Sequence, residues 1–120
     1  MKSHDFGKQG EDFAEEFLRQ HGYRILVRNY RVKRGEIDLI ADDQGMIVFV
    51  EVKTRKANDW NAFEAVGPVK QRRMIHAATQ YLVETFGRED IHSRFDVLAV
   101  LLGDNGEFKG DLIKEAFSIF

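Results

Sequence analysis

Apolar residues recur along this chain at two spacings, and these spacings predict its secondary structure. Between Phe13 and Leu18 they recur as on one face of a helix, which predicts a helix over residues 7–21 that Gly22 ends. The following stretches carry strand-like apolar runs divided by short turns, which favour an antiparallel meander. The three strands expected in this meander are residues 23–32, 36–42 and 46–54.

The second half of the chain predicts a helix followed by a buried strand. Pro68 suits the first position of a helix, which is expected to end near Thr85. Residues 94–102 read RFDVLAVLL, a continuous apolar run typical of a central strand. A strand, a helix and a second strand in this order usually give two parallel strands. The tail at 105–120 is expected to add a short edge strand near 112–119.

The composition predicts one soluble globular domain over residues 1–120. The chain is 43% hydrophobic, 32% charged and 12% aromatic, a balance that is sufficient to bury a core. No apolar run approaches the roughly 20 residues that span a bilayer, and the polar start lacks the apolar centre of a signal peptide. A cytoplasmic location is therefore expected. The absence of cysteine excludes disulfides, a zinc ribbon and a cysteine nucleophile.

The strand that ends in VEVKT places a carboxylate and an amine on one of its faces. Side chains alternate along a strand, so Glu51 and Lys53 share a face. In the preceding strand Glu36, Asp38 and Ile40 are expected to share a face, and the short turn between the strands brings Asp38 beside Glu51. Carboxylates this close repel one another unless a cation lies among them, and hard oxygen ligands suit Mg²⁺ or Mn²⁺. The pattern predicts a divalent metal site.

An ordinary ion network is the alternative to a metal site. Glu51 and Lys53 can pair with each other or with Asp38, and Glu-x-Lys on a strand is a weak signal by itself. The first helix favours the metal site, because Glu11 falls on its buried side, unlike the three acids that follow. Lys70 likewise falls on the sheet-facing side of the second helix. Polar groups thus recur where one rim of the sheet meets the core.

The order of these elements and residues resembles the PD-(D/E)xK nuclease superfamily. Within it, the stretches GEIDLIA, FVEVKTR and RFDVLAV are similar to the YraN-like family of small bacterial proteins, which are themselves similar to archaeal Holliday-junction resolvases. The resemblance covers nearly the whole chain. It implies an α/β fold with a restriction-endonuclease-like core, a mixed β-sheet flanked by helices in the order α-β-β-β-α-β. One departure is Ile37, which precedes Asp38 where the superfamily motif has proline.

The resemblance also implies roles for individual residues. Asp38 and Glu51 would ligate Mg²⁺ or Mn²⁺, with the carbonyl of Val52 completing the shell. Lys53 would position or help activate the attacking water, and Glu11 matches an additional acid of the resolvase-like branch. Such a site suits phosphodiester hydrolysis, because the metal and the lysine both stabilise negative charge in the transition state. The residues assigned to the catalytic site are Glu11, Glu36, Asp38, Glu51 and Lys53.

Basic residues surround the predicted site in the sequence. From Phe17 to Gly35 the chain carries six basic residues and no acid, which suggests a surface that faces a polyanion. A solvated basic strand explains the same pattern equally well. Other basic residues follow the VEVKT strand or lie on the second helix, where they suit sequence-independent phosphate contacts. The residues expected to bind nucleic acid are Arg31, Lys33, Arg34, Arg55, Lys56, Lys70, Arg72 and Arg73.

Two aromatic residues, Trp60 and Phe63, lie in the loop at 55–66 directly after the predicted site. We expect both to cover the core, the commoner fate of a large aromatic side chain, with base stacking or packing in a dimer as alternatives. Asp96, near Arg94 at the start of the last apolar strand, is expected to be a structural partner.

The predicted function is that of a Mg²⁺-dependent endonuclease that hydrolyses phosphodiester bonds in structured DNA, similar to a Holliday-junction resolvase. The expected partner is nucleic acid, in the first place DNA, with no membrane partner. The resemblance to resolvases also raises the expectation of a homodimer. Two alternatives stay open, namely a nucleic-acid-binding adaptor of the same fold that cleaves nothing and a purely structural ion network.

Overall fold

The computed structural model describes the backbone of residues 3–118 and, apart from residues 3–6 and 64, their side chains. Within these residues the order of elements expected from the sequence is confirmed, including the edge strand at the end. The elements are α1 (Ser3–Gln20), β1 (Tyr23–Val32), β2 (Gly35–Asp43), β3 (Met46–Lys56), the 3₁₀ turns η1 (Ala57–Asp59) and η2 (Ala62–Glu64), α2 (Pro68–Phe86), β4 (Ser93–Leu102) and β5 (Phe108–Phe117).

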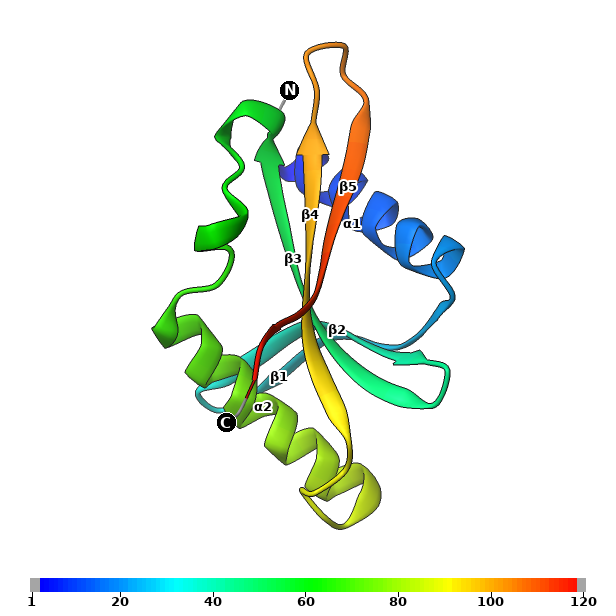
Figure 1. The fold of residues 1–120 in the computed structure, drawn as a ribbon, viewed down its shortest axis with the longest axis vertical. Coiled ribbons are helices and arrows are strands. Elements are labelled where there is room, and N and C mark those ends of the chain that lie inside the picture. Colours follow the sequence, from blue (N-terminus) through cyan, green and yellow to red (C-terminus); the bar gives the residue numbers. More distant parts are fainter. Residues whose placement is uncertain (1–2, 119–120) are drawn as a thin grey trace.

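The strands form one mixed sheet in the order β1-β2-β3-β4-β5 (Figure 1). The first three strands are the predicted antiparallel meander. β4 then runs parallel to β3, because α2 carries the chain back across the sheet before the next strand begins. β5 pairs antiparallel with β4. The sheet confirms the predicted class, a mixed β-sheet flanked by helices that is compatible with a restriction-endonuclease-like core.

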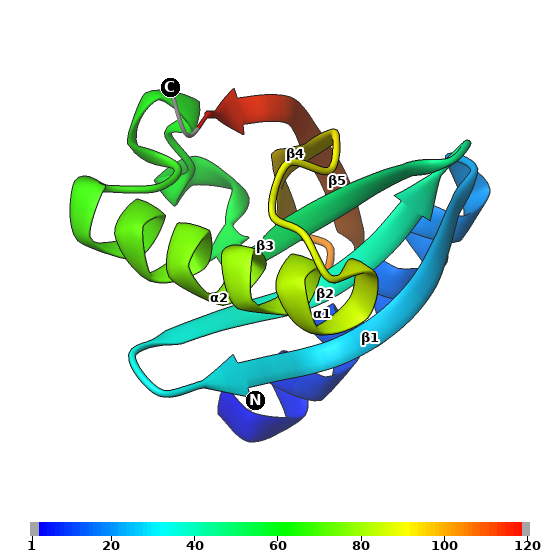
Figure 2. The same cartoon turned by 90° about the horizontal axis from the view of Figure 1, so that it is seen from below.

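The two helices cover opposite faces of the sheet and bury two separate cores (Figure 2). On one face, α1 inserts Ala14 and Leu18 against apolar side chains of β3 and β4 such as Val50. On the other face, α2 packs Met74 against a cluster that contains Phe49. Alternation along β3 therefore buries both faces of this central strand. Neither described helix is long and apolar enough to cross a membrane.

The ends of several elements differ from the predicted bounds. α1 begins at Ser3, four residues before the predicted start. β3 continues to Lys56 because its pairing with β4 extends to the end of that strand. β5 begins at Phe108 rather than near 112, and ends at Phe117; residues 119–120 lie outside the described residues. Long-range pairing, which local patterns do not report, fixes these strand ends.

The alternation expected along β2 is interrupted next to Asp38. Ile37 and Ile40 both pack in the core under α2, although they are three residues apart, while Leu39 packs under α1. Asn29, on the neighbouring strand β1, has a left-handed backbone with φ of 51° at this level, between the pairs Arg28–Leu39 and Tyr30–Ile37. The prediction that Glu36, Asp38 and Ile40 share one face was therefore wrong.

Candidate functional site

Asp38 and Glu51 meet where β2 and β3 stop pairing. The last paired residues are Leu39 and Val50, so the strands separate immediately beyond them. There the carboxylate of Asp38 accepts a hydrogen bond of 2.8 Å from the backbone N–H of Val52. The prediction that the meander brings Asp38 beside the Glu51 end of β3 is thus confirmed.

The Glu51 carboxyl group is buried at this strand end, with 5% of the residue exposed. Burial raises its pKa, and hydrogen bonding and negative charge from Asp38 raise it further, to about 8. The positive charges of Lys70 and Lys53 act in the opposite direction without cancelling the rise. Two neighbouring carboxyl groups here compete for a proton or for another cation.

Lys70, in the first turn of α2, connects Glu51 to Glu36. Its ammonium nitrogen lies 3.4 Å from Glu51 Oε2 and 3.2 Å from Glu36 Oε1. Burial lowers the pKa of Lys70, but the charges of Glu51 and Glu36 outweigh that effect, so the pKa lies above its ordinary value. The sequence left a phosphate contact and an ion pair open for Lys70, and the structure shows an ion pair with two carboxylates.

Glu36 lies among three cations from two elements, α2 and β1. Besides Lys70 it approaches Arg73 of α2 at 3.8 Å and Arg31 of β1 at 3.9 Å. The hydrogen bond from Lys70 is the main reason why the pKa of Glu36 lies below its ordinary value. Glu36 is therefore connected to Glu51 by their shared ion pair with Lys70. It lies at the edge of the Asp38–Glu51 group rather than in its centre.

Lys53 extends the face of β3 that carries Glu51. The residue is half-buried, and its charge lowers the pKa of Glu51. Its ammonium group forms no ion pair with the described carboxylates, in contrast to that of Lys70. An amine next to the carboxylates but not bound by them is available to an anionic ligand.

A cavity of about 190 Å³ opens between α1 and the sheet on the other side of Asp38. Asp38 and Val52 line it from the strands, and Glu11 lines it from α1. Glu11 is exposed rather than buried, so the expectation that it points into the core was wrong, although it does face the predicted group across this cavity.

Glu15, one helical turn after Glu11, is the partly buried acid of this helix face. Its carboxylate forms a salt bridge of 2.7 Å with Arg28 of β1, and this bond lowers the pKa of Glu15 below its ordinary value. The prediction that Glu15 points outward was wrong. The signal was present in the sequence, since a residue four positions after Glu11 lies on the same side of a helix.

Asp38 and Glu51 are the part of the predicted metal site that the structure brings together. The described residues contain no group of three or more His, Asp or Glu side chains placed to hold a metal ion. Magnesium commonly uses one or two protein carboxylates, together with water and substrate phosphate. The pair of carboxylates therefore fits such a site, whereas a cage formed by protein side chains alone is absent from the described chain.

Basic side chains occupy the exposed surface around the first turns of α2. Gly35, the first residue of β2, lies so close to this helix that a Cβ atom there would be 2.6 Å from the Arg73 carbonyl oxygen. The hairpin and the helix thus form one surface, which we call the basic rim. The residues of the basic rim are Arg31, Lys33, Arg34, Arg72 and Arg73, all exposed.

The remaining predicted cations lie at the end of β3. Arg55 and Lys56 are exposed there, and the side chain of Arg55 donates a hydrogen bond to the carbonyl of Thr54. Gly10 of α1 approaches the same strand end closely, since a Cβ atom there would be 3.0 Å from Thr54 Oγ1. Arg55 and Lys56 thus lie on β3, beyond Glu51 and Lys53 on the same strand.

The two loop aromatics differ from each other. Trp60 is half-buried and donates a hydrogen bond of 2.7 Å to Asp111 of β5. Phe63, in η2, is 100% exposed, so the expectation that it covers the core was wrong. Asp96 is fully buried and accepts hydrogen bonds from Arg94 and Tyr23, which confirms its predicted structural role.

Comparison with known proteins identifies the family. A model of the uncharacterised protein family UPF0102 matches residues 10–100. The chain belongs to this family. It is 48% identical to the UPF0102 protein of Chlorobium phaeobacteroides strain BS1 over 120 residues, which cover 95% of this chain and 94% of that protein. The UPF0102 protein of Symbiobacterium thermophilum is also 48% identical, over 112 residues that cover 92% and 94% of the two chains.

The UPF0102 match confirms the YraN-like family predicted from the sequence. The matched residues include the carboxylates, Lys53, Lys70 and the basic rim. A third relative, the UPF0102 protein of Syntrophus aciditrophicus, is 46% identical over 114 residues, which cover 94% of this chain and 88% of that protein. The names of these relatives state the family and no activity.

Proposed function

We propose that this UPF0102 protein is a metal-dependent nuclease of the PD-(D/E)xK type, which hydrolyses phosphodiester bonds in structured DNA. The observation that carries the proposal is the contact between Asp38 and the buried Glu51 at the end of β2–β3 pairing. Burial of two adjacent carboxyl groups is unfavourable unless a cation or a proton compensates it. A divalent ion is the compensation that also gives the arrangement a catalytic use.

The chain offers a third oxygen ligand beside these carboxylates. In a β-strand the N–H and C=O of one residue point to the same side. The N–H of Val52 points to Asp38, so its carbonyl is directed to the same side, where β2 no longer pairs. Asp38, Glu51 and the Val52 carbonyl would thus hold Mg²⁺ or Mn²⁺. The bound ion would lower the pKa of its water and offset charge on the phosphate.

Cationic side chains supply the remaining requirements of phosphodiester hydrolysis. Water attacks phosphorus, one P–O ester bond breaks, and the leaving alkoxide takes a proton. Lys53 lies on the Glu51 face of β3 and would stabilise the additional negative charge that forms on the phosphate. The basic rim, together with Arg55 and Lys56, would bind neighbouring phosphates without reading sequence. Glu11 would contact water or metal from across the cavity.

The proposal is tested by Mn²⁺ titration of the wild type, monitored through water proton relaxation, followed by a cleavage panel of branched, duplex and single-stranded DNA and of RNA. Asp38→Asn should remove saturable Mn²⁺ binding and cleavage together. Asp104→Asn, an exposed acid in the turn after β4, is the matched control and should change neither. Equal Mn²⁺ binding by wild type and Asp38→Asn would contradict the proposed site.

A nucleic-acid-binding adaptor that does not cleave is the second candidate. It is favoured by the position of Lys70, whose ammonium group already compensates Glu51 and Glu36 without a metal ion. Under this alternative, Asp38→Asn leaves DNA affinity unchanged and no member of the panel is cleaved. Metal-dependent cleavage that Asp38→Asn abolishes would exclude the adaptor.

A further inference from the structure

The loop between β3 and α2 carries a phenylalanine side chain that does not pack in either hydrophobic core. Phe63 is 100% exposed, whereas Phe86, another exposed phenylalanine, is 44% exposed. Full exposure of an aromatic ring forgoes the free energy that its burial would provide. A side chain of this kind is commonly found where a binding partner covers it.

The backbone is held in place both before and after Phe63 in the chain. Before it, the hydrogen bond from Trp60 to Asp111 fixes the loop to β5. At the turn itself, the Asn61 side chain accepts a hydrogen bond of 3.0 Å from the N–H of Phe63. After it, Ala65 is buried, with 5% exposed. The ring therefore projects from an anchored turn.

The elements on either side of this loop carry cations that lie at the proposed site. β3 contributes Lys53 before the loop, and α2 contributes Lys70 just after it. The loop also contains an acid, Asp59, which does not favour phosphate at the turn itself. Phosphate contacts thus fall to the flanking elements, and the loop is left to contact the uncharged part of a nucleotide.

We propose that Phe63 stacks on an unpaired nucleobase of the substrate, an inference that rests on the proposed function and specifies its substrate as nucleic acid with unpaired bases. A single ring is sufficient for this contact, because every base has a flat π face. A second copy of the chain fits less well. Stable dimers bury about 800 Å² on each partner, whereas Val69 on α2 is the next exposed large apolar side chain after Phe63 in the described chain.

The test measures DNA affinity in an Asp38→Asn background with a metal chelator, so that cleavage plays no part. The probes are a fluorescein-labelled single-stranded oligothymidylate, the same strand with abasic sites, and a blunt duplex of equal length. Phe63→Ala should weaken binding of the single strand about tenfold and leave duplex binding unchanged. Phe63→Tyr should bind as tightly as the parent. Phe86→Ala, the matched control at the far end of α2, should have no effect.

A double-mutant comparison identifies stacking itself. If Phe63 stacks on a base, Phe63→Ala costs little affinity on the abasic strand, because the partner is already absent. Equal affinity of Phe63→Ala and its parent for the single strand would overturn the inference, and so would a loss of dimerisation in sedimentation without a loss of binding. No DNA binding by the parent would overturn it as well. The nuclease proposal is judged separately by Mn²⁺ binding and cleavage.

Discussion

The backbone N–H of Val52 donates a hydrogen bond of 2.8 Å to the carboxylate of Asp38. This bond orients Asp38 through the main chain of the neighbouring strand, just beyond the last β2–β3 pair. It uses one of the roughly four lone-pair positions of a carboxylate, so the others stay available beside Glu51. An asparagine amide in the place of Asp38 can accept the same bond through its carbonyl oxygen.

Asp38→Asn should therefore abolish metal binding without unfolding the protein. The variant keeps the bond from Val52 and loses the negative charge that opposes ionisation of Glu51. Without metal, its free energy of unfolding near neutral pH should equal that of the wild type or exceed it by about 1 kcal/mol. Urea denaturation in the presence of a chelator measures this difference. A clear loss of stability would instead mean that Asp38 belongs to a structural ion network.

The stability of the metal-free protein should fall as the pH rises. The pKa of Glu51 in the folded protein, about 8, exceeds its ordinary value of 4.5. Folding thus favours the protonated carboxyl group, so the contribution of Glu51 is fully present below about pH 4.5 and is lost as the pH approaches 8. Glu51→Gln, which stays uncharged, should flatten this part of the profile. The measurement is the urea midpoint of both proteins at several pH values in a chelator.

Saturating Mn²⁺ provides the control for this profile. Metal binding requires ionised carboxylates, so added Mn²⁺ should stabilise the wild type most at the higher pH and leave Glu51→Gln nearly unaffected. A wild-type profile that already matches Glu51→Gln in the chelator would show that Glu51 is not perturbed in solution.

Lys70→Met should destabilise the protein, because Glu36 loses its ion-pair partner and Glu51 loses a positive charge that opposes the rise of its pKa. The expected loss is about 1–3 kcal/mol in the free energy of unfolding at neutral pH. Arg72→Met, two residues along the same helix at an exposed position, is the matched control and should have little effect. Adding Glu51→Gln to Lys70→Met should recover part of the loss, which a double-mutant cycle measures.

The central pair of the site could be predicted because local rules determine it. Alternation along β3 and a short turn are sufficient to bring Asp38 to Glu51, whatever the rest of the fold does. The face of Glu36 could not be predicted in this way, since the alternation along β2 is interrupted between Ile37 and Ile40, beside the left-handed backbone of Asn29. Asparagine tolerates that conformation, but its presence in a strand does not require it.

Other parts of the site depend on how the elements pack. The contact of Glu15 with Arg28 depends on the position of α1 over β1, which helical periodicity does not specify. Exposure of Phe63 depends on the bond from Trp60 to Asp111, whose partners lie far apart in the sequence. Local patterns therefore predicted which residues gather at this end of the sheet more reliably than which way each one points.

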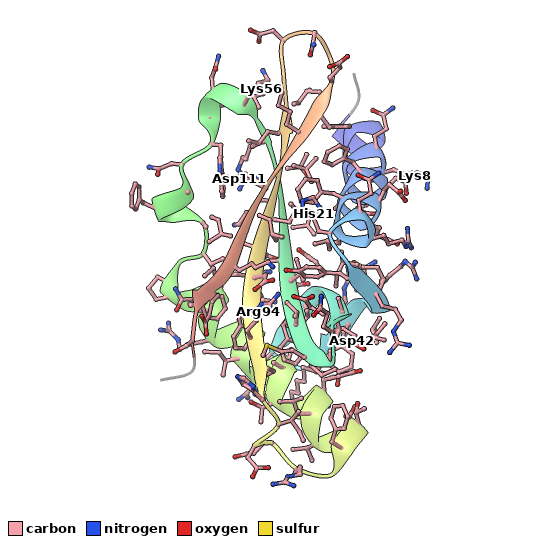
Figure 3. The ribbon with its side chains drawn as sticks, turned by 45° about the vertical axis from the view of Figure 1, so that its right-hand side comes forward. Lys8, His21, Asp42, Lys56, Arg94 and Asp111 are labelled. Atoms are coloured by element: carbon pink, nitrogen blue, oxygen red, sulfur yellow. The ribbon has the colours of Figure 1, made fainter. Side chains whose placement is uncertain are left out.

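Tyr23→Phe should weaken the fold while leaving the proposed metal site intact. The Tyr23 hydroxyl donates a hydrogen bond of 2.7 Å to the fully buried Asp96 and accepts one of 2.8 Å from Arg94. Its removal should cost about 1–3 kcal/mol, because a buried carboxylate loses a donor. Asp96 pairs with Val50, next to Glu51 in sequence, but side chains alternate along a strand, so the two groups lie on opposite faces of the sheet. Figure 3 shows Arg94 and Lys56 toward opposite ends of the sheet.

The measurement on Tyr23→Phe pairs urea denaturation with Mn²⁺ titration. A lower free energy of unfolding with unchanged Mn²⁺ affinity would show that the Tyr23–Asp96 contact and the proposed metal site act independently. The loss of metal binding in Asp38→Asn can then be assigned to the missing carboxylate. If Tyr23→Phe instead lost Mn²⁺ binding while still folded, general loosening of the sheet would be enough to abolish the site. Loss of binding in any single variant would then no longer identify a ligand.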